Sequence, residues 1–476
     1  MNILEQPLSG KTRSEHDLLG DREIPVEYYF GVQTLRGVEN FQTSGIRINH
    51  YPEMINALAM VKEAAAIANC ELGYMDTEKK DAIVKACREI YKEGKLHNHF
   101  VVDVIQGGAG TSTNMNANEV IANRALEILG HQRGEYKYCH PNNDVNLAQS
   151  TNDAYPTGMK LAIIIANKQL VEVLKKLVDA FKNKAKEFEN VVKMGRTHLQ
   201  DAVPMTLGQE FEGYAVALEE AVDALEDVAK HFYANNMGAT AVGTGINSDP
   251  DYPPLVSKYL SEITGLPMVP AKNLVQATND TTGFILYSST LKYLAVKLCK
   301  TCNDLRILTS GPRTGIGEIK LPPMQPGSSI MPGKVNPVIA EVVSQIAFRV
   351  IGNDHAATMG AEAGQLELNV MEPVIVASIF DSITVLKNGM QILRDKCIVG
   401  ITANEERCKD LVLNSIGLVT ALNPYIGYEA STAIAKEAME TGRGVYELVL
   451  MKGLLSQAQL DDILAPENMV KPRKMK

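Results

Sequence analysis

Five long segments of the chain carry apolar residues at helical spacing, and their length constrains the fold more than any other feature. In residues 157–190, for example, Leu161, Ile164, Leu170 and Phe181 recur at intervals that place side chains on one face of an α-helix. The other four segments are residues 204–236, 281–309, 337–359 and 372–395. At 1.5 Å per residue, the first two helices are each roughly 50 Å long. Such helices bury their apolar faces against other long helices, so we expect a central helical bundle.

Little of the remaining sequence shows the alternation of apolar and polar residues that is typical of strands. The best strand candidates are residues 46–50 and a short piece near Lys320. The predicted fold class is therefore mainly all-α. A chain of 476 residues exceeds one ordinary hydrophobic core. We expect a mostly helical N-terminal domain over residues 1–150, the long-helix bundle over 151–405 and a small helical C-terminal domain over 406–476.

Charge and composition restrict the partners of the chain. The net charge of −9 argues against nucleic acid or an anionic membrane as the main partner. We find no apolar run long enough to span a bilayer, and the N-terminus lacks the pattern of a signal peptide. Seven scattered cysteines, an odd number, indicate reduced thiols and hence a cytoplasmic location. An acidic chain that binds an anion must concentrate positive potential locally.

One loop, residues 327–336, combines two hydroxyls, a lysine and an amide with small residues; it is called the signature loop below. Its sequence is Gly-Ser-Ser-Ile-Met-Pro-Gly-Lys-Val-Asn. Pro337 is expected to open the fourth long helix, with Asn336 as the N-cap. The free N–H groups of a helix start suit an anion, as does the nearby Lys334. The loop is therefore a candidate carboxylate site in which Ser328 is a nucleophile or base. The alternative is an ordinary structural loop.

Three further loops gather hydroxyl and amide side chains, namely residues 107–116, 149–156 and 195–201. The first lacks the Gly-Lys-Ser/Thr ending of a phosphate-binding loop, which weakens a nucleotide-binding interpretation. Taken alone, each loop is typical of a helix cap, because these side chains bond readily to nearby backbone. However, the last two loops and the signature loop each precede a proline that we expect to begin a long helix. These prolines are Pro156, Pro204 and Pro337.

The expected helix lengths limit which loops of one chain can meet. If the helices beginning at Pro156 and Pro204 are antiparallel neighbours, their starts lie roughly 50 Å apart. His198 is six residues from Pro204, and that length of extended chain spans only about 20 Å. Residues 150–152 and Thr197 of one chain therefore cannot share a site. If these loops do form one site, it is built from different subunits, which predicts an obligate oligomer.

The signature loop is similar, almost residue for residue, to that of the fumarase/aspartase superfamily. The resemblance extends from Asp17-Leu-Leu-Gly20 to the segment Pro466-Glu-Asn-Met-Val470. These enzymes remove a β-proton and an α-leaving group from succinyl-type dicarboxylate substrates to give fumarate. The resemblance implies a homotetramer with a multi-helix core, in which each of four sites is built from three chains. It implies no metal and no organic cofactor.

The resemblance also implies the catalytic residues. Removing a proton next to a carboxylate gives an unstable dianionic aci-carboxylate, which must be held by donors placed for that intermediate. Ser328 would be the general base, acting as an alkoxide. The loop N–H groups and Lys334 would stabilise that anion. The glycines and Pro332 of the loop suit a lid that closes and excludes water.

The remaining site residues implied by the resemblance bind the substrate. The β-carboxylate would be held by Thr111, Ser150, Thr151 and Ser329. The α-carboxylate would be held by Lys334 and Asn336, with Thr197 close by. The α-substituent would be contacted by Asn152 and His198. The pocket would be shaped from the closing loop by Met331.

Several segments resemble the aspartase branch of the superfamily more than the fumarase branch, among them residues 150–156, 237–245, 368–374 and 400–404. The resemblance thus implies the reversible conversion of L-aspartate to fumarate and ammonium. A class II fumarase is the alternative, because both branches share the signature loop. Argininosuccinate and adenylosuccinate lyases fit these segments less well. A non-catalytic structural protein is a further alternative, against which the intact set of Ser328, Lys334 and Asn336 weighs.

Overall fold

The computed structural model describes residues 3–471, and helices dominate this part of the chain. The predicted fold class, mainly all-α, is confirmed. The strands in the described part pair only in twos, as four small sheets. Within the same residues, no helix is both long enough and apolar enough to cross a membrane.

All five predicted long helices are present. Their bounds are α5 (Thr151–Glu187), α6 (Leu207–Ala229), α9 (Thr282–Leu308), α10 (Val338–Glu362) and α11 (Glu372–Lys396). The residues that set the helical spacing of α5 are buried, since Leu161, Leu170 and Phe181 are each 0% exposed. The apolar residues that recur at helical spacing in the sequence are therefore the ones that pack in the core.

Two of the three prolines do not begin helices as predicted. Pro156 lies inside α5, where it has no N–H to donate to the carbonyl of Asn152. The side-chain nitrogen of Asn236 donates to that carbonyl instead, at 3.0 Å, so the helix continues through the proline. Pro204 lies in a strand opposite Met194, within a two-stranded hairpin whose edges tolerate proline. Only Pro337 behaves nearly as predicted, because α10 begins at the following residue.

The chain forms two compact units, each assembled from separate stretches of sequence. Unit 1 comprises the residues up to 171, together with 223–293 and 348–385. Unit 2 comprises 172–222, 294–347 and the residues from 386 onward. The predicted domain boundaries near residues 150 and 405 stay a prediction.

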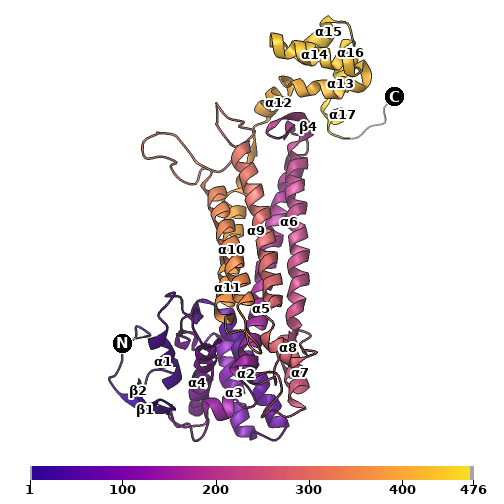
Figure 1. Cartoon of the computed structure of the whole chain (residues 1–476). Coiled ribbons are helices and arrows are strands. Elements are labelled where there is room, and N and C mark those ends of the chain that lie inside the picture. Colours follow the sequence, from indigo (N-terminus) through magenta and orange to yellow (C-terminus); the bar gives the residue numbers. More distant parts are fainter. Residues whose placement is uncertain (1–2, 472–476) are drawn as a thin grey trace. The chain divides into compact units, whose positions relative to one another are not determined.

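Unit 1 is built around α2 (Pro52–Glu71), which packs against α3 (Thr77–Glu93) and α7 (Tyr252–Thr264). Helix α3 also packs against α4 (Thr111–Ile128), and Figure 1 shows these helices side by side. Most of α2 is buried, because neighbours surround it. The polar residues that α2 buries, Lys62 among them, need partners inside the protein. The other named elements of this unit are β1 (Thr12–Asp17), β2 (Gly20–Pro25), α1 (Val32–Asn40), β5 (Ala234–Asn235), β6 (Val269–Pro270) and α8 (Leu274–Asn279).

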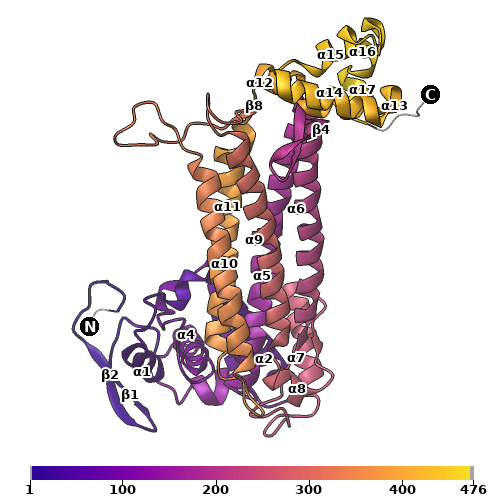
Figure 2. The same ribbon diagram turned by 45° about the horizontal axis from the view of Figure 1, so that its top comes forward.

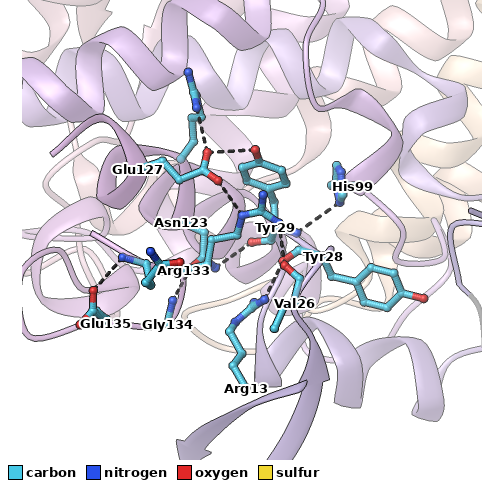
Figure 3. A network of polar contacts seen from close by, with 12 residues as sticks. Arg13, Val26, Tyr28, Tyr29, His99, Asn123, Glu127, Arg133, Gly134 and Glu135 are labelled. Atoms are coloured by element: carbon cyan, nitrogen blue, oxygen red, sulfur yellow. Dashed lines mark hydrogen bonds and ion pairs between the residues drawn. The ribbon is translucent and has the colours of Figure 1, made fainter. Parts of the chain in front are cut away.

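A polar network fastens the segment after β2 to α4 in unit 1 (Figure 3). The guanidinium of Arg133 lies 3.9 Å from the centre of the Tyr29 ring and donates to Glu127 at 2.8 Å. Arg133 also donates to the carbonyl of Val26 at 2.7 Å, and the Tyr29 hydroxyl donates to Glu127 at 2.9 Å. Burial together with the nearby cation of Arg133 lowers the pKa of His99 to about 4, so this ring is neutral in the network.

Unit 2 contains a hairpin and the C-terminal helices. The hairpin pairs β3 (Val192–Thr197) with β4 (Gln200–Thr206), and a second short pair joins β7 (Ile319–Lys320) to β8 (Thr402–Ala403). The strand predicted near Lys320 is confirmed. The C-terminal helices, which Figure 2 shows gathered in one cluster, are α12 (Glu405–Leu413), α13 (Val419–Ile426), α14 (Tyr428–Thr441), α15 (Val445–Met451), α16 (Gln457–Ile463) and α17 (Pro466–Met469). They share one core with Met194 of β3, so the hairpin is anchored to them.

The strand predicted over residues 46–50 is wrong. Ile48–His50 form a turn of 3₁₀ helix, and the only strand-like contact of this segment, among the described residues, is a single bridge between Arg47 and Asp103. The carboxylate of Asp103 accepts backbone N–H groups from Ser44 and Gly45, at 3.0 and 2.9 Å. Asp103 thus holds the turn that precedes the segment. The segment itself makes a short backbone contact, from the Ile48 N–H to the Val102 carbonyl and from the Val104 N–H to the Ile46 carbonyl, each at 2.9 Å, before it turns into the 3₁₀ helix.

Candidate active site

The first part of the candidate site is the start of α4 in unit 1. Gly108, Ala109 and Gly110 all have positive φ, at 87°, 53° and 86°, and they turn the chain directly into Thr111, the first residue of the helix. A Cβ on Gly110 would lie 2.5 Å from the Tyr155 ring, so only glycine fits there. Two of the first backbone N–H groups of α4 are satisfied locally, because that of Thr111 donates to the Gly108 carbonyl at 3.0 Å and that of Thr113 to the Gln106 side chain at 3.1 Å. The helix start still carries the positive end of the helix dipole, which favours an anion.

The second part is the start of α5. The Ser150 hydroxyl accepts the N–H of Asn152 at 3.2 Å, and the Ser150 N–H donates to Asp153 at 3.0 Å. Asp153 is fully buried and also accepts the N–H of Thr240 at 2.8 Å. Burial raises the pKa of Asp153 to about 7. The side-chain nitrogen of Asn152 donates to the Ala241 carbonyl at 2.7 Å, which leaves the amide oxygen of Asn152 as an acceptor.

The starts of α4 and α5 are adjacent in unit 1, because the side-chain nitrogen of Asn114 donates to the Thr151 hydroxyl oxygen at 3.2 Å. Behind them lies a buried lysine that no sequence motif marks. Lys62 is 0% exposed, and its Nζ donates to the side-chain oxygens of Asn114, Asn146 and Gln149 at 2.8, 2.9 and 2.8 Å. Burial lowers the pKa of Lys62 to about 7. The available signal was a lysine on a helix rich in apolar residues, followed directly by Glu63, and this pattern alone indicates no particular role.

The signature loop lies in unit 2 and is closed at its base. The N–H of Gly327 donates to the Lys334 carbonyl at 2.7 Å, and a Cβ on Gly327 would lie 2.6 Å from that oxygen. The side-chain nitrogen of Asn336 donates to the Gly327 carbonyl at 2.9 Å. Because α10 begins at Val338, Pro337 rather than Asn336 precedes it. The prediction of Asn336 as N-cap is therefore wrong by one residue, and its amide closes the loop instead.

Within the loop, the Oγ of Ser328 accepts two backbone N–H groups, from Ile330 at 3.2 Å and from Met331 at 3.0 Å. Two donors aimed at one oxygen favour its anionic form. Ser328 is half-buried, whereas Ser329, Met331 and Lys334 are exposed. An open hollow of about 500 Å³ is lined by residues 323–326 and by Ser328, Met331 and Lys334. Figure 1 shows the loop projecting beyond the start of α10.

Thr197 and His198 lie at the tip of the β3–β4 hairpin and are exposed. The expectation that their loop leads directly into a helix is wrong, because β4 intervenes before α6. His198 and Leu199 form the two-residue turn and have φ of 55° and 60°. Residues other than glycine rarely adopt this left-handed backbone conformation. The conformation of His198 and Leu199 is therefore energetically unfavourable, and the paired strands must maintain it.

A buried group of charges fixes the hairpin within unit 2. Glu318, which is 0% exposed, accepts from Arg196 at 2.9 Å and pairs with Lys193 at 3.0 Å. Lys193 is 2% exposed and also pairs with Glu210 at 2.6 Å. Arg196 directly precedes Thr197, so these contacts determine where the tip of the hairpin points.

Replacing Glu318 with alanine should strongly destabilise unit 2. The change leaves the buried Lys193 and the partly buried Arg196 with one carboxylate fewer, and removing one partner of a buried ion pair costs about 3–5 kcal/mol. We expect a large fall in the urea concentration at the unfolding midpoint. The matched control is Glu219→Ala, which removes an exposed pair with Lys182 and should cost about 1 kcal/mol or less. Similar midpoints for the two variants would contradict the assignment of Glu318 to a buried structural network.

The sequence-predicted site residues are divided between the two units. Those in unit 1 are Thr111, Ser150, Thr151 and Asn152, which the adjoining starts of α4 and α5 bring together. Those in unit 2 lie on two separate loops, the hairpin tip and the signature loop. They are Thr197, His198, Ser328, Ser329, Met331, Lys334 and Asn336.

Comparison with known proteins shows that the chain is similar to lyases. A family described as lyase matches residues 20–352, and one described as fumarase C C-terminus matches residues 418–471. The chain is 60% identical to an aspartate ammonia-lyase of Pseudomonas canavaninivorans, over 97% of each chain. It is 52% identical to an aspartate ammonia-lyase of Escherichia coli K12, over 98% of this chain and 97% of the relative.

Two solved structures are also similar. A fumarate lyase:delta crystallin from Brucella melitensis, bound to cobalt, is 52% identical with a TM-score of 0.95, covering 97% of this chain and all of that one. A class II fumarase from Schistosoma mansoni is 36% identical with a TM-score of 0.92, covering 98% of this chain and all of that one.

Proposed function

This chain belongs to the fumarase/aspartase superfamily of lyases and is a carbon–nitrogen lyase, and on that premise we propose that it catalyses the reversible deamination of L-aspartate to fumarate and ammonium. The two aspartate ammonia-lyases described above are 60% and 52% identical to the chain, whereas the similar fumarase is 36% identical. This difference favours aspartate over malate as the substrate.

The environment of Ser328 is the observation that best supports the chemistry. A serine hydroxyl at its ordinary pKa is too weak a base to remove a proton from carbon. The two N–H groups that donate to Ser328 Oγ stabilise its alkoxide, and Lys334 lies on the same loop. The alkoxide takes the β-proton of aspartate, and the electron pair of the broken C–H bond enters the adjacent carboxylate. That pair then forms the double bond as the C–N bond breaks, and ammonia leaves with the electrons of that bond.

The substrate groups match the two sets of residues. The β-carboxylate, which carries the extra charge of the aci-carboxylate, is bound by Thr111, Ser150, Thr151 and Ser329. The backbone N–H groups at the start of α4 add positive potential there. The α-carboxylate is bound by Lys334 and Asn336, near Thr197. The amide oxygen of Asn152 accepts a hydrogen bond from the α-ammonium, with His198 beside it and Met331 covering the pocket. No metal or organic cofactor enters this reaction.

The length of α5 supports a site shared between subunits of a homotetramer. Its 37 residues span roughly 55 Å. Thr197 lies ten residues beyond the end of α5, and ten extended residues reach back at most about 36 Å. Thr151 at the start of α5 and Thr197 of the same chain therefore lie in different sites. We propose that each site takes residues 150–152 from one chain, Thr197 and His198 from a second and the signature loop from a third.

The cysteines favour the cytoplasm. All seven, Cys70 to Cys408, are free thiols, as expected of a protein kept in a reducing compartment.

The first test is to offer purified protein L-aspartate and L-malate separately and to measure fumarate by its ultraviolet absorbance. We expect fumarate from aspartate and none from malate. Fumarate from malate alone would replace the ammonia-lyase with a class II fumarase on the same site. Fumarate from neither substrate would contradict the proposed reaction and favour a structural role for the fold.

A further inference from the structure

The buried cation of unit 1 has an unusual set of partners. Lys62 Nζ donates to three side-chain amide oxygens, those of Asn114, Asn146 and Gln149. A buried ammonium is costly and is most often balanced by a carboxylate in direct contact. Here the hydrogen-bond partners are neutral amides, and Asp153 contributes its charge without a direct bond. Three neutral acceptors around one cation are poorly suited to stabilising a fold and well suited to fixing the orientation of amides.

The cation determines which way the Asn114 amide faces. Three oxygen acceptors around Nζ require three N–H donors, so the geometry is that of an ammonium. An ammonium has only donors, so the amide oxygen of Asn114 must face Lys62 and its nitrogen must face away. That nitrogen donates to the Thr151 hydroxyl oxygen at 3.2 Å and to the side-chain oxygen of Asn146 at 3.1 Å. Because the Thr151 oxygen accepts from Asn114, its hydroxyl hydrogen is free to donate to a ligand.

A second contact of Lys62 fixes the chain that leads into α5. The Gln149 side-chain oxygen accepts from Nζ, so its nitrogen faces the other way and donates to the carbonyls of Val145 and Leu147, at 3.0 and 3.2 Å. Gln149 directly precedes Ser150. The same cation thus holds the backbone of the Ser150–Thr151 turn and, through Asn114, the hydroxyl of Thr151.

We propose that Lys62 is a positioning residue for carboxylate binding, which acts through Asn114 to present the Thr151 hydroxyl as a hydrogen-bond donor to the substrate carboxylate. The inference rests on the proposed function only in taking Thr151 as a carboxylate ligand. Neither Lys62 nor Asn114 touches the substrate. Their effect depends on the hydroxyl of Thr151 and disappears when that hydroxyl is removed.

The decisive variant is Asn114→Asp. Its carboxylate still accepts from Lys62 but has no N–H for Thr151, whose hydroxyl hydrogen then turns toward the new acceptor and away from the ligand. A hydrogen bond to a charged group is worth about 10- to 100-fold in binding, so the affinity for succinate should fall by a factor in that range. Succinate binding is measured by calorimetry on the assembled protein. The matched control is Asn123→Asp, which changes another fully buried asparagine of α4, one that bonds to Tyr29 and Tyr136 instead.

A double-mutant cycle separates positioning from general loss of structure. Thr151→Val removes the hydroxyl, so adding Asn114→Asp or Lys62→Met to Thr151→Val should weaken succinate binding little further. Additive losses would overturn the proposal, as would unchanged affinity in Asn114→Asp. If Lys62→Met does not fold, the Asn114 cycle decides alone.

Two outcomes distinguish this inference from the proposed reaction. If the wild-type protein binds succinate and the cycle is non-additive, the inference stands even when fumarate forms from a substrate other than aspartate. If the wild-type protein makes fumarate from aspartate but the cycle is additive, the reaction stands and the positioning role of Lys62 fails. A wild-type protein that does not bind succinate would overturn the inference, because Thr151 would then serve no carboxylate.

Discussion

Ser328→Ala should abolish fumarate formation from L-aspartate, lowering kcat by about 10³-fold or more while leaving succinate affinity within about threefold. The hydroxyl that we propose takes the β-proton is then lost. The N–H groups of Ile330 and Met331 then face an empty position instead of an alkoxide. The measurement combines steady-state rates, from the absorbance of fumarate, with succinate calorimetry on the same preparation.

The neighbouring serine provides the comparison. Ser329→Ala removes an exposed hydroxyl of similar size from the same loop, so general disturbance of the loop should be comparable. Because Ser329 is proposed to bind the β-carboxylate, its loss should raise KM and weaken succinate binding while preserving more of kcat than Ser328→Ala does. If Ser328→Ala kept a tenth or more of the wild-type kcat, Ser328 would not be the base. If the two variants had the same kcat and KM, the loop would act only as a lid.

The long helices were predictable from the sequence because each buries one continuous apolar face. The hairpins were not, since their strands lack the apolar alternation that signals a strand. In β1 and β2, only Glu15 and Ile24 are buried, and the turn between these strands is Leu18-Leu19 rather than a pair containing glycine. The β3–β4 turn, His198-Leu199, also lacks glycine. Both turns are exposed, with Leu18 99% and Leu199 69% accessible, and neither carries the glycine-containing pair that signals a hairpin in a sequence.

The two misplaced helix starts have different physical causes. Proline is expected in the first turn of a helix because it has no N–H to donate to the carbonyl four residues earlier. Inside a helix, however, another side chain can donate to that carbonyl instead. Asn236 does so for Asn152, although the two residues are 84 positions apart in the sequence. Pro204 avoids the same problem by lying in a two-stranded hairpin. Long-range compensation of this kind is invisible to any local pattern.

Only some of the candidate site residues could be predicted from the sequence. Local motifs identify Ser328, Lys334 and the residues 150–152 because each forms part of a dense polar loop. Lys62 contacts three side-chain amides, which lie between Asn114 and Gln149 in the sequence. The lysine and these amides come together only because α2 packs against its neighbours in the fold. The residue that we propose to act through others therefore has no motif of its own, whereas the residues that we propose to bind the substrate do.

Mixing two inactive variants should restore activity if the site is shared between chains. Ser328→Ala lacks the base, and Thr151→Val lacks a carboxylate donor, so each homo-oligomer should be nearly inactive. In hybrids that form by random association of equal amounts, each site takes these two positions from different chains. About one quarter of the sites then hold both native residues, so activity should approach about one quarter of the wild-type value. The two variants are unfolded together and refolded, or expressed together, and fumarate formation is measured.

The design separates a shared site from a site within one chain. If one chain supplied both residues, every site in every hybrid would carry one of the two substitutions, and mixing would restore nothing. Refolding each variant alone controls for the procedure. A second mixture combines wild type with the double variant Ser328→Ala/Thr151→Val, so that both substitutions are on the same chain. If each site is shared between chains, about one quarter of the sites again keep both native residues. For a site within one chain, that mixture would keep about one half of the wild-type activity, so the two mixtures together determine whether the base and the carboxylate donor come from the same chain.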